Sequence, residues 1–461
     1  MTGPPQRGLK ILLISTYELG HQPLGLAAPA AALRADGHDV TCHDLAVEPL
    51  APERLHGIDL VGISVPMHTA ARLGVEVARQ IRQRSPTAHI AFYGLYATPL
   101  GEMLAGSGPG DSAIGGEYEP GLVALARSLS MGEAAARERP TLSATTFERQ
   151  RYPVPDRTGL APLERYAHLE IGEELRLAGY VEASRGCAHR CTHCPITPVY
   201  GGRLRLVQPG VVLADIGQQV QMGARHITFG DPDFLNAVSH SLAIVEDVRR
   251  RYPGTTFDVT AKVEHLVEHA ELLPRLRDAG CVFITSAFES TNDQVLRRLQ
   301  KGHTRADLER VLAFAAREDL VLRPTWVAFT PWTTADDYLD MLAFIDAHDL
   351  ADHVPPVQYA LRLLLPPGSP LVPMLEGEGR LEGFDEEALS YAWSNQDARM
   401  DELQREIAGV VGAAHDCDGA GSPTLATIRD CAYRVLRGEP APASRVRRAK
   451  AVPGLTESWF C

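Results

Sequence analysis

Residues 182–195 read Glu182-Ala-Ser-Arg-Gly-Cys187-Ala-His-Arg-Cys191-Thr-His-Cys194-Pro195, and the rest of the chain is organised around them. The three cysteines follow a short strand-like run, so their thiolates share one tight loop. Three such thiolates can hold three irons of a cubane 4Fe–4S cluster and leave the fourth iron open to a small molecule. The alternatives are a chance triplet or a zinc knuckle, but structural zinc uses four protein ligands, typically as two separated pairs. The sequence therefore predicts Cys187, Cys191 and Cys194 as cluster ligands.

The cysteine loop resembles the signature of the radical SAM superfamily, Cys-x-x-x-Cys-x-x-Cys, in which the residue before the last cysteine is usually aromatic. His193 stands at that position and is a candidate cofactor-binding residue. The resemblance implies that the amino and carboxylate groups of S-adenosylmethionine (SAM) chelate the open iron. One-electron reduction then cleaves the sulfonium and yields a 5′-deoxyadenosyl radical.

The bulk composition is that of an ordinary globular protein, with 45% hydrophobic and 22% charged residues among 461. A formal net charge of −13 argues against non-specific binding to nucleic acid or anionic membranes. The first apolar run, residues 11–15, is too short for a signal peptide, and no long apolar stretch occurs. Eight cysteines are too few for a disulfide scaffold. We therefore expect a soluble, cytoplasmic protein without nucleic-acid or membrane partners.

The first 130 residues alternate short apolar runs with helical segments, which is typical of a doubly wound parallel sheet. The expected strands are 9–16, 39–42, 60–64, 89–93 and 112–114. Such sheets bind ligands at the carboxyl ends of their strands. The candidate loops are therefore 16–25, 64–69, 94–98 and 115–119, and the candidate cofactor-binding residues within them are Ser64, Gly94, Gly116 and Glu117.

This arrangement resembles the cobalamin-binding domain at the front of many radical SAM enzymes, which implies cobalamin as a further cofactor. The usual lower-ligand signature, Asp-x-His-x-x-Gly, is absent, and the nearest approach, Asp36-Gly-His38, lies at the wrong end of the sheet. We interpret His38 as a structural turn residue. The alternative is a degenerate domain kept for interaction.

Residues 176–370 alternate strands and helices again, after a polar linker at 131–175. Expected strands at 180–184, 226–229, 256–261, 281–286, 323–329 and 357–364 indicate a partial barrel of TIM type. The family resemblance identifies it as the (β/α)6 radical SAM fold. It also implies SAM contacts at Gly230, Asp231 and Asp233 after the second strand, and at Ser286 and Glu289 after the fourth.

A helical extension is expected at 371–436, with one long amphipathic helix over 385–411 and a second helix at 424–436. Residues 437–461 read as a flexible tail that ends in Cys461, whose thiol could be delivered to the chemistry and is our catalytic candidate. An alternative groups His415, Cys417, Cys431 and Cys461 into an auxiliary metal site.

The whole chain is similar to radical SAM proteins named for a Cys-Cys-Ala-Glu-Pro or Cys-selenocysteine-Ala-Glu-Pro tail. The matching stretches are residues 12–20, the cysteine loop and residues 456–461. Those relatives continue with a second cysteine or selenocysteine, so a selenocysteine codon read as a stop would explain the end at Cys461. Such a pair suggests redox work or capture of a soft ion.

These observations predict an enzyme that cleaves SAM reductively at a 4Fe–4S cluster. With cobalamin, the resemblance implies methyl transfer to an unactivated carbon or phosphorus of a small-molecule or peptide substrate, with flavodoxin or ferredoxin as electron donor. Two alternatives stay open. One is a cobalamin-independent transfer or rearrangement, including aminocarboxypropyl transfer to a soft element such as arsenic, and the other is a non-enzymatic Fe–S redox sensor.

Overall fold

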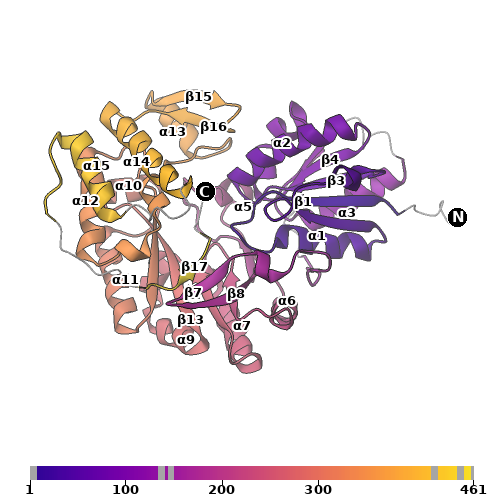
Figure 1. Ribbon diagram of the computed structural model, residues 1–461, viewed down its shortest axis with the longest axis horizontal. Coiled ribbons are helices and arrows are strands. Elements are labelled where there is room, and N and C mark those ends of the chain that lie inside the picture. The colour runs from indigo at the N-terminus through magenta and orange to yellow at the C-terminus, as the bar shows by residue number, and fades with distance from the viewer. Residues whose placement is uncertain (1–7, 133–140, 144–149, 417–423, 444–450, 458–461) are drawn as a thin grey trace.

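The computed structural model describes residues 8–132, 141–143, 150–416, 424–443 and 451–457. Figure 1 shows an N-terminal α/β unit beside a larger α/β unit, with the C-terminal helices at the far edge of the second. Within the described residues, no helix is both long enough and apolar enough to cross a bilayer.

The N-terminal unit is built on a parallel sheet of order β2-β1-β3-β4-β5-β6. Its strands are β1 (Lys10–Ser15), β2 (Asp39–Asp44), β3 (Leu60–Ser64), β4 (His89–Tyr93), β5 (Ser112–Ile114) and β6 (Thr141–Ser143). Nearly all side chains of β1, β3 and β4 are buried, as expected of strands covered on both faces. The covering helices are α1 (Leu24–Ala35), α2 (His68–Arg84) and α3 (Tyr118–Ser130). The predicted doubly wound sheet is confirmed.

The second unit is a curled sheet of order β14-β13-β12-β11-β8-β7-β17. Five neighbouring strands are parallel, namely β8 (Glu174–Val181), β11 (His226–Phe229), β12 (Thr256–Thr260), β13 (Cys281–Glu289) and β14 (Val321–Trp326). The short strand β7 (His168–Ile171) pairs antiparallel with β8. A half-barrel of this kind confirms the predicted fold class, and the segment expected as a linker contributes a strand to each sheet.

Helices cover the outer face of the half-barrel. They are α6 (Pro209–Gln221), α7 (Val238–Arg251), α8 (Val263–Glu268), α9 (Leu273–Ala279), α10 (Asp293–Arg298), α11 (Arg305–Arg317) and α12 (Ala335–Ala347). Two of them, α11 and α12, begin at reciprocal capping boxes, Thr304 with Asp307 and Thr334 with Asp337. These caps satisfy free backbone N–H groups and fix where each helix starts.

The prediction of a sixth barrel strand at 357–364 is wrong. Residues Pro356–Tyr359 form a short 3₁₀ helix after Pro355, and only one bridge, between Phe329 and Arg362, continues the parallel pattern. The edge of β14 is satisfied by a side chain instead, because the Trp326 N–H donates to Gln358 Oε1 at 2.8 Å. A side-chain acceptor removes the need for a backbone ladder there.

The prediction of a single helix over 385–411 is also wrong. The structure has a hairpin, β15 (Leu381–Asp385) and β16 (Ser390–Trp393), and then helix α14 (Ala398–Asp416). The Asp385 carboxylate accepts from the N–H groups of Glu387 and Ala388, both at 2.9 Å, and makes the turn. Leu389, at φ +51°, leaves the turn and packs in the hydrophobic core of the N-terminal unit. The buried residues that suggested one stripe thus belong to two elements.

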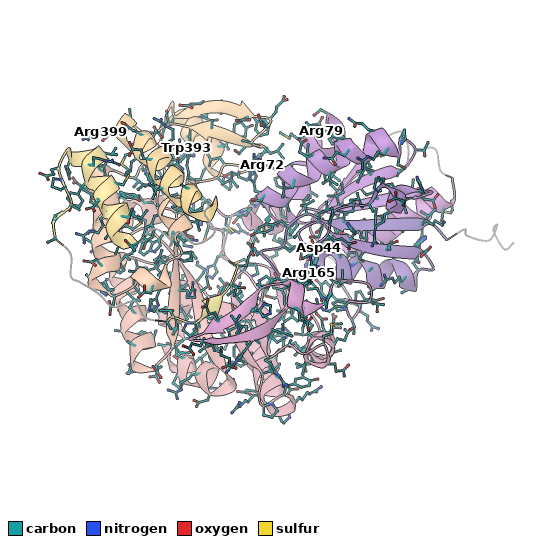
Figure 2. The ribbon with its side chains drawn as sticks, in the orientation of Figure 1. Asp44, Arg72, Arg79, Arg165, Trp393 and Arg399 are labelled. Carbon is teal, nitrogen blue, oxygen red and sulfur yellow. The ribbon has the colours of Figure 1, made fainter. Side chains whose placement is uncertain are left out.

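The hairpin lies opposite α2 of the N-terminal unit, with α13 (Leu371–Gly377) before it and α15 (Leu425–Arg437) after α14 (Figure 1). Arg72 and Arg79 on α2 face a groove whose other wall holds Glu386 and Glu387 of the hairpin turn (Figure 2). The C-terminal extension therefore contacts both units. The predicted helix at 424–436 is confirmed as α15.

Part of the segment expected as a flexible tail is ordered. Strand β17 (Gly454–Leu455) pairs antiparallel with β7, and Thr456 exchanges two hydrogen bonds with His168. Arg323 of β14, at the other edge of the curled sheet, donates to the Pro453 carbonyl at 2.9 Å. Pairing with β7 satisfies an otherwise open strand edge, and the tail thereby bridges the two edges of the half-barrel.

Candidate active site

The three cysteines of the predicted cluster lie on one loop between β9 (Ser184–Gly186) and α5 (Ile196–Tyr200). Strand β9 pairs antiparallel with β10 (Leu204–Leu206), which closes the loop at its base. The Cys194 N–H donates to the Cys191 carbonyl at 3.2 Å. Burial raises the pKa of Cys194 to about 12, and Cys187 and Cys191 act on it electrostatically, so the three thiols form one group.

The surroundings of these thiols fit an anionic cluster. Asn236 donates from Nδ2 to Cys187 Sγ at 3.4 Å. Lys301, only 4% exposed, is coupled electrostatically to Cys191 and Cys194. A buried ammonium beside thiolates stabilises negative charge there. Lys301 is placed by hydrogen bonds from Thr192 to the Leu299 and Arg298 carbonyls, which tie the loop to the end of α10.

Glu289 joins the cysteine loop to Lys301. Its Oε1 lies 3.1 Å from His193 Nε2 and 3.1 Å from Lys301 Nζ. Burial opposes its ionisation, but Lys301 and His193 hold the pKa of Glu289 well below its usual range. Its φ of +64°, rare for a residue with a side chain, follows a register shift in β13 after Ala287. This irregularity turns the carboxylate toward the loop.

Lys301→Met is expected to lower the reduction potential of a reconstituted cluster, because a buried positive charge beside the cysteines disappears. A shift on the order of tens of millivolts follows from the removal of one nearby charge. Redox titration monitored by electron paramagnetic resonance (EPR) measures it. Lys301→Arg keeps the charge and should stay close to the wild-type value, and an unchanged potential in Lys301→Met would contradict the assignment.

Two of the predicted SAM-binding residues are engaged by the protein. Asp231 is buried and accepts from the Ala183 N–H at 2.9 Å and the Ser184 hydroxyl at 2.5 Å, and burial raises its pKa to about 7. Ser286 donates its hydroxyl to the Ala261 carbonyl at 2.8 Å. At Gly230 a Cβ would lie 1.8 Å from the Tyr180 hydroxyl, so this position excludes any side chain. These contacts fasten β9 and the strand ends.

Asp233 meets two histidines that the sequence did not single out. Its Oδ2 lies 2.7 Å from His265 Nδ1 and 3.7 Å from His189 Nε2. His189 stands between two of the predicted cluster ligands, and His265 lies on α8. The position of His189 inside the cysteine motif was a signal in the sequence, whereas His265 is brought to it only by the fold.

The carboxyl edge of the N-terminal sheet has features that fit a ligand rich in polar groups, as cobalamin is. Ser15 Oγ and Glu18 Oε1 are buried there without an aligned hydrogen bond. Ser64, buried at the end of β3, and Glu18 line a cradle at Gly25, where an added Cβ would lie 2.5 Å from Ser64 Oγ. Gly94 and Gly116 have φ of +114° and +63°. Three of the four predicted cofactor-binding positions thus lie along this edge.

The histidine at the opposite end of the sheet is structural, as predicted. His38 Nδ1 accepts from the Leu9 N–H at 3.2 Å, and Nε2 lies 3.3 Å from Asp36. The loop after β1 carries a different histidine, His21, whose ring stacks on Tyr180 of the half-barrel at 4.7 Å. Burial lowers the pKa of His21 to about 4. This loop therefore reaches into the second unit, which its sequence alone did not indicate.

The fourth predicted position, Glu117, lies at the junction of the two units. Its carboxylate accepts from the hydroxyls of Tyr152 at 2.5 Å and Tyr200 at 3.0 Å, and lies 3.6 Å from Arg185. Arg185 also pairs with Glu119 and Glu182, each at 2.8 Å. Because Arg185 stands two residues before Cys187, these contacts fix the N-terminal unit against the stem of the cysteine loop.

A second contact between the units involves the loop after β2. Arg165 donates from Nη2 to the Val47 carbonyl at 2.6 Å, and the Tyr166 side chain interacts with Asp44 at the end of β2. Burial raises the pKa of Asp44. The carboxyl edge of the first sheet is thus held against the half-barrel on two sides.

Glu18→Gln is expected to raise the thermal midpoint of the cofactor-free chain more at pH 8 than at pH 5. Burial raises the pKa of Glu18 from 4.5 to about 8, so the folded state holds a proton that the unfolded state releases above pH 4.5. The stability linked to that proton is lost as pH rises toward 8, and glutamine removes the dependence. Calorimetry at the two pH values checks this. Glu76→Gln is the control, because the Glu76 side chain on α2 is exposed. If Glu18→Gln shifted the thermal midpoint equally at both pH values, the raised pKa of Glu18 would be contradicted.

Models of two known families match separate parts of the chain. The B12 binding domain matches residues 10–126, and the radical SAM superfamily matches residues 181–325. The chain joins a B12-binding domain to a radical SAM domain. A radical SAM domain implies SAM and a 4Fe–4S cluster, and a B12-binding domain implies cobalamin, so the predicted cofactors are confirmed at this level. The narrower family named for its C-terminal tail is not confirmed.

Curated relatives are distant. The hopanoid C-3 methylase of Methylococcus capsulatus is 23% identical over 337 residues, covering 68% of this chain and 64% of the relative. The ribosomal protein uS12 methylthiotransferase RimO of Desulfosudis oleivorans is 27% identical over 224 residues, covering 46% of this chain and 48% of the relative. The chain thus spans less than two thirds of either relative.

Solved structures share the fold of this two-domain chain. The cobalamin-dependent SAM radical enzyme OxsB with aqua-cobalamin bound superposes with a TM-score of 0.69 at 16% identity, covering 89% of this chain and 68% of that one. The radical SAM methyltransferase TsrM from Kitasatospora setae, with cobalamin and a [4Fe-4S] cluster bound, has a TM-score of 0.56 at 19% identity and covers 74% of each chain.

Proposed function

We propose that this chain is a cobalamin-dependent radical SAM methyltransferase. It would cleave SAM at a 4Fe–4S cluster held by Cys187, Cys191 and Cys194 and transfer a methyl group to an unactivated centre of a small-molecule or peptide substrate. The names of the relatives support this choice, because they include a hopanoid methylase, the cobalamin-dependent OxsB and the methyltransferase TsrM.

The observation that carries the proposal is the contact between the two domains. Glu117 and Glu119 follow strand β5 of the B12-binding domain and pair with Arg185, two residues before Cys187. Ligands of doubly wound sheets bind at the carboxyl edge, and barrel chemistry takes place at the carboxyl mouth. The ion pairs bring these two edges together, as methyl transfer between the two cofactors requires.

When bound, the cluster supplies the electron that converts SAM into a 5′-deoxyadenosyl radical, and cobalamin supplies the methyl group. The residues of this chain have supporting roles. The three thiolates ligate iron, Lys301 stabilises their charge, and Glu289 with His193 offers polar groups beside the loop. We assign Ser64, Gly94 and Gly116 to the cobalamin site because they line its edge.

The partners remain predictions. We expect flavodoxin or ferredoxin to deliver the electron, and no nucleic acid to bind. Cys461 and Cys417 lie outside the described residues, and the catalytic role of the Cys461 thiol stays a prediction together with the assignment to the tail-named family. The last described residue, Glu457, accepts from the Tyr17 hydroxyl at 3.1 Å in the loop after β1.

The decisive experiment is anaerobic reconstitution with iron, sulfide and hydroxocobalamin, followed by reduction in the presence of SAM. We expect the chain to retain cobalamin through gel filtration and to form 5′-deoxyadenosine. Deoxyadenosine without retained cobalamin would replace the proposal by a cobalamin-independent transfer. Absence of SAM cleavage in a chain that holds its cluster would favour the redox sensor.

A further inference from the structure

A second group of metal-binding side chains lies beside the cysteine loop. One nitrogen each of His189 and His265 and one oxygen of Asp233 lie within 4.8 Å of one another. The three residues come from the cysteine loop, from α8 and from the segment after β11, so the fold rather than a sequence motif brings them together. Two imidazoles and a carboxylate suit divalent transition metals such as manganese, iron and zinc.

The buried carboxylate of Asp233 points to an ion. Its side chain is fully buried, and Oδ2 makes no aligned hydrogen bond although His265 Nδ1 lies 2.7 Å away. His265 Nδ1 likewise lacks an aligned partner. Two polar atoms this close without hydrogen-bond alignment have the relation of two ligands on one ion. Unsatisfied buried carboxylate oxygens are costly, and a cation would remove that cost.

The neighbours of the three residues supply the supporting contacts that metal sites use. Asp233 Oδ1 accepts from the backbone N–H groups of Leu235 and Lys262, both at 3.3 Å, which fixes the carboxylate. His189 Nδ1 lies 3.5 Å from Glu264 Oε2, the arrangement in which a carboxylate orients a metal-binding imidazole.

Charge balance favours a cation as well. The Lys262 ammonium is paired with Glu264 at 2.9 Å rather than with Asp233. Among the ion pairs of the described residues, Asp233 has only the two histidines as partners. Its negative charge is therefore left for an ion or for protonated imidazole.

We propose that His189, Asp233 and His265 form a divalent-cation site next to the cluster loop. Three protein donors leave further coordination positions open, as in catalytic metal sites. The ion would hold an anionic oxygen of a small molecule, such as a carboxylate, close to the cysteines. This inference does not rest on the proposed methyl transfer, because ion binding is measured without SAM or turnover.

Manganese(II) is the probe, since it binds carboxylate and imidazole but little thiolate. The cluster-reconstituted chain is treated with EDTA and titrated with Mn²⁺, and free Mn²⁺ is counted by its six-line EPR signal. We expect one tightly bound Mn²⁺ per chain. Asp233→Asn and His265→Gln should each weaken binding by at least about tenfold.

His269→Gln is the matched control, because that ring lies 5.9 Å from the His265 ring but outside the group. It should bind Mn²⁺ like the wild type. Iron content shows which variants keep their 4Fe–4S cluster. If Asp233→Asn loses the cluster, the Mn²⁺ affinity of His265→Gln alone tests the proposal. Wild-type protein that leaves all Mn²⁺ free, or His265→Gln that binds as tightly as wild type, would overturn the proposal. The alternative would then be a hydrogen-bonded histidine pair, since His189 Nε2 lies 3.2 Å from His265 Nε2.

Discussion

Replacing Cys194 by alanine is expected to abolish the iron–sulfur cluster and with it all cleavage of SAM. Cys194 shares its loop with Cys187 and Cys191, and the three thiols are close enough to affect one another electrostatically. With two thiolates left, a cubane lacks a ligand at a second iron and is not retained. Reconstituted wild type should carry about four irons per chain with a broad visible absorbance, and the variant neither.

Cys281→Ala is the matched control for this experiment. Cys281 is buried, but it lies at the start of β13 and its thiol donates to the Phe283 carbonyl at 3.4 Å. That variant should keep its iron and its 5′-deoxyadenosine formation. A Cys194→Ala chain that still cleaves SAM at the wild-type rate would remove the cysteine loop from the chemistry.

Arg185→Met is expected to cause the largest loss of folding stability among single substitutions at the domain junction. Arg185 is 8% exposed, and its guanidinium pairs with Glu119 and Glu182 and lies 5.1 Å from the ring centroids of Tyr118 and Tyr152. Its removal leaves carboxylates buried without a counter-charge, which typically costs about 3–5 kcal/mol. Urea denaturation of the cofactor-free chain measures the loss.

The size of this loss should depend on pH. Burial already raises the pKa of Glu182, and loss of Arg185 raises it further, so the deficit should shrink as the pH falls and the carboxylates take up protons. Arg79→Met, whose exposed pair with Glu76 lies on α2, should change stability little. If Arg185→Met and wild type had the same free energy of unfolding at pH 8, the domain junction would not depend on the ion pairs of Arg185.

Much of the architecture follows from short-range patterns in the sequence. Short continuous apolar runs such as residues 11–15, bounded by loops, are typical of strands buried on both faces, so the doubly wound sheet was predictable. The cysteine spacing likewise limits the ligand chemistry of the loop, whatever surrounds it. The same reasoning placed Ser64, Gly94 and Glu117 at strand ends, because the carboxyl ends of parallel strands meet at one edge.

Patterns of period three to four failed where the apolar residues belong to separate elements and to two different cores. Leu389 and Trp393 belong to the hairpin, whereas Met400 and Leu403 belong to α14, and all four are buried. The sequence shows only that they are apolar and suitably spaced. The turn made by the Asp385 side chain, and the insertion of Leu389 into the other domain, decide that the segment is not one helix.

The sequence by itself determined most of the parallel strands of both sheets and the close spacing of the three cysteines, because these depend on neighbours within a few residues. Only the tertiary structure decided that Lys301 lies beside the thiols, that Asp233 meets His189 and His265, and that Arg185 joins the domains. It also assigned Asp231 and Ser286 to backbone contacts. Side-chain direction and the pairing of distant strands are set by packing across the whole chain, and the order of residues does not state them.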